Sequence, residues 1–455
     1  MALRSINPTT EEVIQEFDEL SAEAIEQKLA LAQSTFETWR NTSFEERATL
    51  MHKAAQNLRD SKAELALVMT REVGKTLTAS EAEIEKCALT CDYYADNAAT
   101  FLSEESVETD AGQSYVRFDP IGVVLAVMPW NFPLWQVFRF AAPALMAGNV
   151  GILKHASNVQ MSGQAIEKVF VDAGFPEGAF LNLEIGSAKV EAIIRDPRVK
   201  AATLTGSEYA GSQVAKVAGE EIKKTVLELG GSDPFIVFAD ADIDQAVSGA
   251  VTGRMQFNAG QSCIAAKRFI VEESIASEFA DKLTTAVEEL VVGDPESAET
   301  SVGPLASKQQ LDDIEKQVTA SVEAGATLLC GGKRKGEKGY FYEPAVLANV
   351  TKGMPVYDEE VFGPALPIIS FKTNEEAIAI ANDSEYGLGA TIFSSDTNKA
   401  QNIARDIDSG AVFINNPVKS DPRLPFGGVK KSGYGRELSH YGIREFVNVK
   451  TVWIK

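Results

Sequence analysis

Between residues 121 and 238, short apolar runs alternate with helical stretches in a regular order. Short apolar runs bounded by turn residues are typical of strands, and intervening helical stretches are typical of crossover connections between parallel strands. This order predicts an α/β fold built on a parallel sheet. The expected strands are Val123 to Met128, Gly151 to Lys154, Phe180 to Leu183, Ala201 to Leu204, Thr225 to Leu227 and Phe235 to Phe238.

The chain has 455 residues, which is longer than one hydrophobic core usually supports. Residues 10 to about 102 are rich in Glu, Ala, Leu and Lys with helical periodicity, and a second α/β series runs from Ile270 to about Asn415. Two α/β domains are therefore expected.

Two polar segments, 103–120 and 443–455, fall outside the predicted sheets. Each contains an alternating stretch, Ser114 to Phe118 in the first and Phe446 to Ile454 in the second, as in a half-exposed strand. An edge strand of this kind needs a partner, so the pattern indicates oligomerisation.

The composition excludes several classes of partner. A formal charge of -22 argues against nucleic acid and against an anionic membrane surface, because both require clustered Lys and Arg. No run of about 18 apolar residues and no apolar signal core occurs, so a cytoplasmic location is expected. Four cysteines are too few for a disulfide framework, and the three histidines form no metal-binding spacing, so no metal site is expected.

Cys263 ends the segment Phe257-Asn258-Ala259-Gly260-Gln261-Ser262-Cys263. A cysteine here could be a small buried core residue, since free cysteines often are. Three distant segments, however, contain the partners that a nucleophilic thiol needs. These are the Asn131 amide after Pro129-Trp130, the Glu228 carboxylate before Leu229-Gly230-Gly231, and Glu360 beside Phe362.

Taken together and in this order, the four segments resemble the aldehyde dehydrogenase family over nearly the whole chain. The resemblance implies a Rossmann-like cofactor domain and an α/β catalytic domain. It also implies a small projecting β-sheet that pairs subunits into a homodimer or a dimer of dimers. The implied divisions are 1–102 and 121–231 for cofactor binding, 232–430 for catalysis, and 103–120 and 443–455 for oligomerisation.

The resemblance implies a reaction at a small-molecule aldehyde. The Cys263 thiolate adds to the carbonyl, while the Asn131 amide and the Cys263 backbone N–H stabilise the oxyanion. After hydride has left, Glu228 acts as general base toward the water that releases the acid. An ordinary thiol is only a few per cent ionised at pH 7, so Cys263 requires local activation.

The expected cofactor is a nicotinamide dinucleotide, although the usual Gly-x-Gly-x-x-Gly pattern is missing where the sheet begins. Instead, the segment from Gly206 through Ser207 to Gly211 follows a strand and opens a helix, where N–H groups can bind a pyrophosphate. Ser207 alone could equally be a helix N-cap. The resemblance to the family implies that the segment from Gly206 to Gly211 binds phosphate.

Two residues bear on the choice of cofactor: Lys154, which ends the expected strand Gly151 to Lys154, and Ser157, three residues later. The resemblance implies that Lys154 binds the adenosine ribose, and Ser157 replaces a glutamate that chelates both ribose hydroxyls in many NAD-preferring members. A glutamate would repel a 2′-phosphate by up to about 4 kcal/mol at an effective dielectric constant near 20. NADP is therefore favoured over NAD. The resemblance also assigns these residues to the cofactor site: Trp130, Leu229, Glu360 and Phe362.

The substrate is indicated by Arg139, which shares a helical face with Trp135. Succinate-semialdehyde dehydrogenases resemble this chain in having the arginine, and a structural arginine is the alternative. Some of them carry a second arginine where this chain has Phe257, and Ser420 could supply a hydroxyl in compensation. A bacterial-type succinate-semialdehyde dehydrogenase is expected, and the alternative is a broad-range dehydrogenase of uncharged aldehydes.

Replacing Ser157 with glutamate is expected to shift cofactor preference toward NAD. The new carboxylate would chelate the ribose hydroxyls of NAD and repel the 2′-phosphate of NADP. The measurement is the ratio of kcat/KM for NADP and NAD in both proteins. A tenfold or greater preference of the unmodified protein for NAD would contradict the inference, whatever the variant does.

Overall fold

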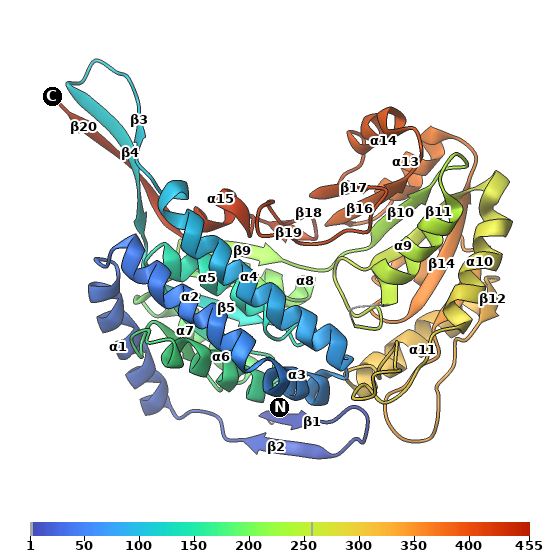
Figure 1. The fold of residues 1–455 in the computed structure, drawn as a ribbon, viewed down its shortest axis with the longest axis horizontal. Helices are drawn as coiled ribbons and strands as arrows, with labels where there is room; N and C mark the ends of the chain where they lie inside the picture. The colour runs from blue at the N-terminus through green and yellow to red at the C-terminus, as the bar shows by residue number, and fades with distance from the viewer. Residues whose placement is uncertain (1–2, 256–257) are drawn as a thin grey trace.

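The computed structural model describes residues 3–255 and 258–455, and it contains two large sheets at opposite ends of the molecule (Figure 1). The first sheet has six strands in the order β19-β9-β8-β5-β6-β7, and all neighbours except β19 and β9 are parallel. Its strands are β5 (Val123–Met128), β6 (Val150–His155), β7 (Phe180–Asn182), β8 (Val199–Thr205), β9 (Lys224–Glu228) and β19 (Gly433–Tyr434).

Eight helices belong to the half of the chain that forms this sheet. They are α1 (Ala22–Trp39), α2 (Phe44–Asp60), α3 (Lys62–Val73), α4 (Leu77–Phe101), α5 (Trp135–Met146), α6 (Gln160–Asp172), α7 (Val190–Arg195) and α8 (Glu208–Glu220). Every residue of α5 is buried, because α5 packs between the sheet and helices α2 and α4. One hydrophobic core joins these helices to the strands.

The second sheet has seven strands in the order β12-β13-β14-β11-β10-β16-β17, parallel except for the edge strand β12. It has its own hydrophobic core. The strands are β10 (Asp233–Val237), β11 (Ala266–Glu272), β12 (Thr327–Cys330), β13 (Ala345–Ala348), β14 (Ala365–Phe371), β16 (Gly389–Phe393) and β17 (Ala411–Ile414). The helices are α9 (Ile243–Met255), α10 (Ala276–Glu288), α11 (Lys308–Glu323), α12 (Pro355–Asp358), α13 (Asn374–Asn382) and α14 (Thr397–Ala404).

A third sheet projects from the body of the molecule (Figure 1). In it, β20 (Val447–Ile454) pairs antiparallel with β4 (Gln113–Pro120), which also pairs with the short β3 (Glu105–Ser106). The two alternating segments of the sequence are therefore partners of each other. The α/β fold with a projecting β-sheet is confirmed.

One part of the predicted helical region is wrong. Residues 13–17 form strand β2 (Val13–Phe17), which pairs antiparallel with β1 (Leu3–Ile6). Helical periodicity begins only at Ala22, after the N-cap Ser21. The hairpin is held by long-range contacts, since the Ser5 hydroxyl donates to Glu72 and the Arg4 N–H donates to the Ser157 carbonyl at 3.1 Å. Local periodicity could not indicate either contact.

Strand bounds agree with the expected runs to within two residues at each end, and β5 agrees in full. Strand β19 was not expected in the first sheet. It comes from a glycine-rich segment near the C-terminus, residues 427–435. The division of the chain into a cofactor-binding and a catalytic domain stays a prediction, because sheets alone do not assign a function. In the described ranges, no helix combines the length and the apolar character needed to cross a membrane.

Candidate active site

Cys263 lies between the two large sheets, where it lines two cavities. The larger cavity has a volume of about 420 Å³ and the smaller one about 120 Å³. Among the described residues, Gln136 is the only other residue that lines both cavities. The larger cavity brings together many of the predicted residues: Trp130, Asn131, Gly206, Ser207, Leu229, Cys263, Glu360 and Phe362.

The cysteine loop is tied to the first sheet by reciprocal amide hydrogen bonds. The Asn131 side-chain N–H donates to the Gln261 carbonyl at 3.1 Å, and the Asn258 side-chain N–H donates to the Asn131 carbonyl at 2.9 Å. Asn131 follows the end of β5, whereas Gln261 precedes β11 of the other sheet. An amide nitrogen carries two N–H groups, so Asn131 keeps one for an oxyanion. Asn131 and Cys263 therefore line the larger cavity together.

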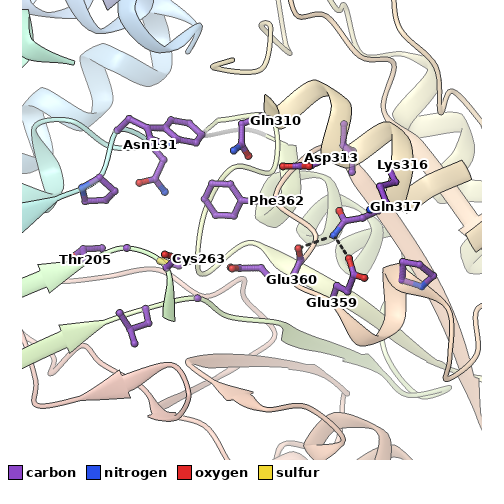
Figure 2. A pocket seen from close by; sticks show the side chains of 18 of the residues that line it. Asn131, Thr205, Cys263, Gln310, Asp313, Lys316, Gln317, Glu359, Glu360 and Phe362 are labelled. Carbon is purple, nitrogen blue, oxygen red and sulfur yellow. Dashed lines mark hydrogen bonds between the residues drawn. The ribbon is translucent and has the colours of Figure 1, made fainter. Parts of the chain in front are cut away.

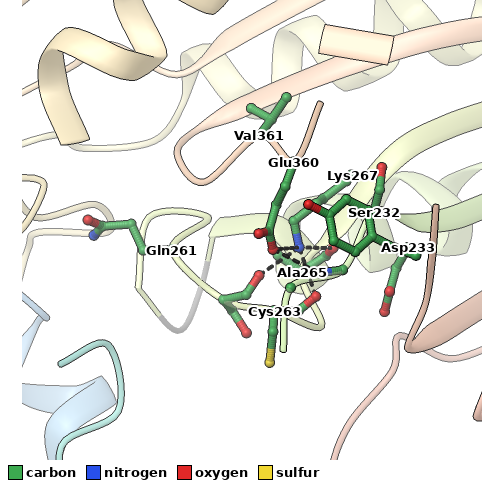
Figure 3. Close-up of polar contacts among 12 residues, drawn as sticks. Ser232, Asp233, Gln261, Cys263, Ala265, Lys267, Glu360 and Val361 are labelled. Carbon is green, nitrogen blue, oxygen red and sulfur yellow. Dashed lines mark hydrogen bonds and ion pairs between the residues drawn. The ribbon is translucent and has the colours of Figure 1, made fainter. Parts of the chain in front are cut away.

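Lys267 holds the cysteine loop from the opposite side, and the sequence reading missed it (Figure 3). Its ammonium donates to the carbonyls of Ser262 and Cys263, both at 2.8 Å, and lies 3.6 Å from the Glu360 carboxylate. A buried lysine requires such partners because an uncompensated charge is costly in the interior. The only available signal was a lysine within the buried strand β11.

Burial raises the pKa of the Cys263 thiol to about 11, although Arg139 and Lys267 oppose the shift. At pH 7, such a thiol is ionised in roughly one molecule in ten thousand. Only a thiolate is strongly nucleophilic, so Cys263 could act as a nucleophile only after losing this proton.

Glu228 ends β9 and is only 2% exposed, but it lines neither cavity. Burial raises the pKa of its carboxyl well above the usual range, and the nearby Glu437 carboxylate adds to the shift, whereas Arg139 opposes it. Among the described residues, its oxygens have no hydrogen-bond partner. Glu228 is therefore a proton-holding group beside the site.

The start of α8 suits an anionic group. Ser207 is its N-cap, and the Ser207 hydroxyl accepts a hydrogen bond from the Ala210 N–H at 3.3 Å. The capping alternative is thus observed, yet the hydroxyl proton is still available to donate, and the first-turn N–H groups have no intrahelical acceptor. Gly211 does not reach the cavity. A Cβ there would lie 2.6 Å from Leu229, so Gly211 allows α8 to pack closely on β9.

Figure 2 shows Glu360 and Phe362 pointing into the larger cavity. Glu360 accepts a hydrogen bond from the Gly231 N–H at 2.9 Å, and Phe362 meets Trp130 edge to face at 5.9 Å. Helix α11, which the sequence reading missed, contributes to the same side of the cavity, because the Gln317 side-chain N–H donates to the Glu360 carbonyl at 3.2 Å. Its lining side chains include Gln310, Asp313, Lys316 and Gln317. Only the polar character of α11 could have suggested a solvated wall.

Lys154 and Ser157 lie at and just after the end of β6, outside the lining of the larger cavity. Lys154 is buried, and burial lowers the pKa of its ammonium. Within the described ranges, neither side chain makes a hydrogen bond or ion pair. Both therefore have donors to offer to a bound group.

The predicted substrate residues Trp135, Arg139 and Ser420 all line the smaller cavity. Arg139 is only 1% exposed, forms an ion pair with Glu437 and donates to the Thr205 hydroxyl at 3.2 Å. These contacts are what the alternative of a structural arginine predicts.

The smaller cavity also has a lysine, Lys86 of α4, that the sequence reading missed. Its side chain comes from the N-terminal helical region, which contains no recognisable site motif. The departure noted at Phe257 falls outside the described residues.

The family model described as the aldehyde dehydrogenase family matches residues 1–452. The chain belongs to this family. The predicted resemblance is confirmed, and with it the identification of the protein as an NAD(P)-dependent aldehyde dehydrogenase.

Relatives of this dehydrogenase share its full length. A probable succinate-semialdehyde dehydrogenase [NADP(+)] of Synechocystis sp. is 53% identical over 454 residues, with 100% of each chain covered. Succinate-semialdehyde dehydrogenase [NADP(+)] 1 of Mycobacterium tuberculosis is 51% identical over 457 residues, again with 100% of each covered. The crystal structure of succinic semialdehyde dehydrogenase from Streptococcus pyogenes in complex with NADP+ superposes with a TM-score of 0.97, at 42% identity and 100% coverage of each chain.

Replacing Glu228 with glutamine is expected to separate the two halves of the reaction. Glutamine keeps the volume of the side chain but cannot accept a proton from water. The variant should release one burst of reduced cofactor per site and then turn over at least 100-fold more slowly than the unmodified protein. The measurement is stopped-flow absorbance at 340 nm with excess aldehyde.

The matched control is Cys263→Ala, which lacks the nucleophile and should give neither burst nor turnover. Cofactor binding in that variant should stay within a few-fold of the unmodified protein. If Glu228→Gln also lacks the burst, Glu228 serves acylation or folding and the assignment of a deacylation base is lost.

Proposed function

We propose that this aldehyde dehydrogenase oxidises succinate semialdehyde to succinate and uses NADP in preference to NAD. The observation that carries the substrate is the smaller cavity, in which the nucleophile Cys263 lies among more cationic than acidic side chains: Lys86, Arg139, Arg254 and Lys419 against Glu83. An uncharged aldehyde has no group that would compensate such a lining. The names of the full-length relatives support the same substrate and cofactor.

The cofactor preference is supported by residues at the end of β6. Ser157 presents no negative charge to a 2′-phosphate, and Lys154 offers a cation among buried surroundings. The relative from Streptococcus pyogenes was crystallised with NADP+. The first turn of α8 and the Ser207 hydroxyl would hold the pyrophosphate, while Glu360 and Phe362 would position the nicotinamide end.

The proposed reaction begins with loss of the Cys263 proton to solvent and attack of the thiolate sulfur on the aldehyde carbon, whose C=O π electrons pass to the oxygen. The Asn131 amide and the Cys263 backbone N–H would stabilise the oxyanion of the thiohemiacetal, and each such donor is worth about 10²- to 10³-fold in rate. Bound NADP supplies the acceptor for the hydride, which leaves the former aldehyde carbon as a thioester. Glu228, once deprotonated, would take a proton from water as that water attacks the thioester, and succinate and the Cys263 thiol are released.

The direct test is a comparison of substrates in the unmodified protein. We expect kcat/KM with NADP to be at least tenfold higher for succinate semialdehyde than for butanal, because only the first has a carboxylate to meet the cationic lining. The measurement is initial rate at 340 nm with each aldehyde and each cofactor. Equal or higher efficiency with butanal would contradict the proposal and indicate a broad-range dehydrogenase of uncharged aldehydes.

We also propose that the protein assembles as a homodimer or dimer of dimers through the projecting sheet. Strand β20 lies at an edge of that sheet and exposes Val449, Trp453 and Ile454. Exposed apolar side chains on an unpaired edge favour association with another copy.

Light scattering should give a mass of at least two chains, and Trp453→Asp should lower that mass. A monomeric unmodified protein would contradict the proposal. The cytoplasmic location stays a prediction.

A further inference from the structure

Lys86 extends from α4 into the smaller cavity, where two contacts fix its ammonium group. The group lies 4.1 Å from the centre of the Trp135 ring and donates a hydrogen bond to the Ser420 hydroxyl at 2.6 Å. The same cavity is lined by Cys263. A short substrate in this cavity can therefore contact the nucleophile and the ammonium together.

Among the described residues, four cationic side chains line the cavity, and they differ in how their donors and charge are used. The Arg254 guanidinium donates to the backbone carbonyls of Ala266, Val361 and Gly363, and Lys419 is exposed. Arg139 already has a carboxylate partner in Glu437. Lys86 has none among the described residues. The acidic groups that act on it are engaged elsewhere, since Glu83 pairs with Lys75 and Asp421 pairs with Arg423 at 2.6 Å.

The electrostatic surroundings agree with this difference. Burial lowers the pKa of the Lys86 ammonium to about 8, and the positive charge of Arg139 contributes. The group is still mostly protonated at pH 7, so the protein holds a partly desolvated cation without a counter-ion. A carboxylate that entered the cavity would supply the missing charge and would find a charge-assisted hydrogen bond.

We infer that Lys86 is the residue that binds the carboxylate of the substrate, with the Ser420 hydroxyl as a second donor. An ammonium has three donors, of which one is used by Ser420, and the Ser420 hydroxyl keeps its own proton to donate. Arg139 is ion-paired with Glu437 and lines the smaller cavity. This assignment rests on the proposed oxidation of succinate semialdehyde and names the residue that selects that substrate.

The test compares Lys86→Met, Lys86→Arg and the surface control Lys53→Met, which removes one exposed positive charge from α2. In Lys86→Met, the ratio of kcat/KM for succinate semialdehyde over butanal should fall about 10- to 150-fold. Most of the loss should appear in KM, because the carboxylate is bound equally before and during the reaction. Lys86→Arg should recover part of the ratio, and Lys53→Met should retain it.

A parallel variant, Arg139→Met, distinguishes the role of Arg139 from that of Lys86. It leaves Glu437 buried without a partner, so it should impair both substrates together and lower the melting temperature. If Arg139→Met lowers the ratio tenfold or more while Lys86→Met retains it, the carboxylate binds Arg139 and the inference is overturned.

A measurement without turnover keeps the test independent of catalysis. Succinate should slow alkylation of Cys263 by iodoacetamide in the unmodified protein. In Lys86→Met, the concentration that gives half protection should rise at least tenfold. Equal protection in both proteins would overturn the role of Lys86.

Two failures can be told apart. An unmodified protein that does not prefer succinate semialdehyde to butanal refutes the proposed function. A preference that persists in Lys86→Met refutes only the role of Lys86.

Discussion

The reciprocal amide hydrogen bonds between Asn131 and the cysteine loop connect the two halves of the molecule at the reacting atom. Each half has its own hydrophobic core. Cys263 and Ile264 pack against the core of the first half, and the polar contacts across the join add directional constraints on the loop. Buried amide hydrogen bonds are directional and costly to lose, which makes them suited to fixing a loop. Because Cys263 lines both cavities, the same contacts set its position toward cofactor and substrate.

A buried carboxylate fixes the start of α5, the helix that carries Trp135 and Arg139. Glu83 of α4 accepts hydrogen bonds from the N–H groups of Leu134 and Trp135, at 2.9 and 2.8 Å, at the start of α5. A carboxylate at a helix N-terminus satisfies N–H groups that have no intrahelical acceptor and complements the helix dipole. The turn containing Asn131 and the face bearing Trp135 and Arg139 are thereby held in one orientation.

The active site is surrounded by buried ionisable groups whose charges depend on one another. Burial and the Glu437 carboxylate raise the pKa of the Glu228 carboxyl, and Arg139, which forms an ion pair with Glu437, opposes only part of the shift. Glu228 consequently keeps its proton to higher pH than an ordinary glutamate. On the other side, Lys267 compensates Glu360 while it holds the Cys263 carbonyl. Proton transfer in the site is therefore governed by neighbours on both sheets.

The sequence by itself determined the α/β fold and the strands of the first sheet other than β19, and it singled out Cys263, Asn131 and Glu228 as candidates, because periodicity and local motifs are properties of short segments. It did not determine which of Arg139 and Lys86 has a carboxylate partner. That depends on Glu437 reaching Arg139 and on Lys86 reaching Ser420, contacts between residues far apart in the chain. Burial and pairing decide what a charge can do, and only the tertiary structure fixes both.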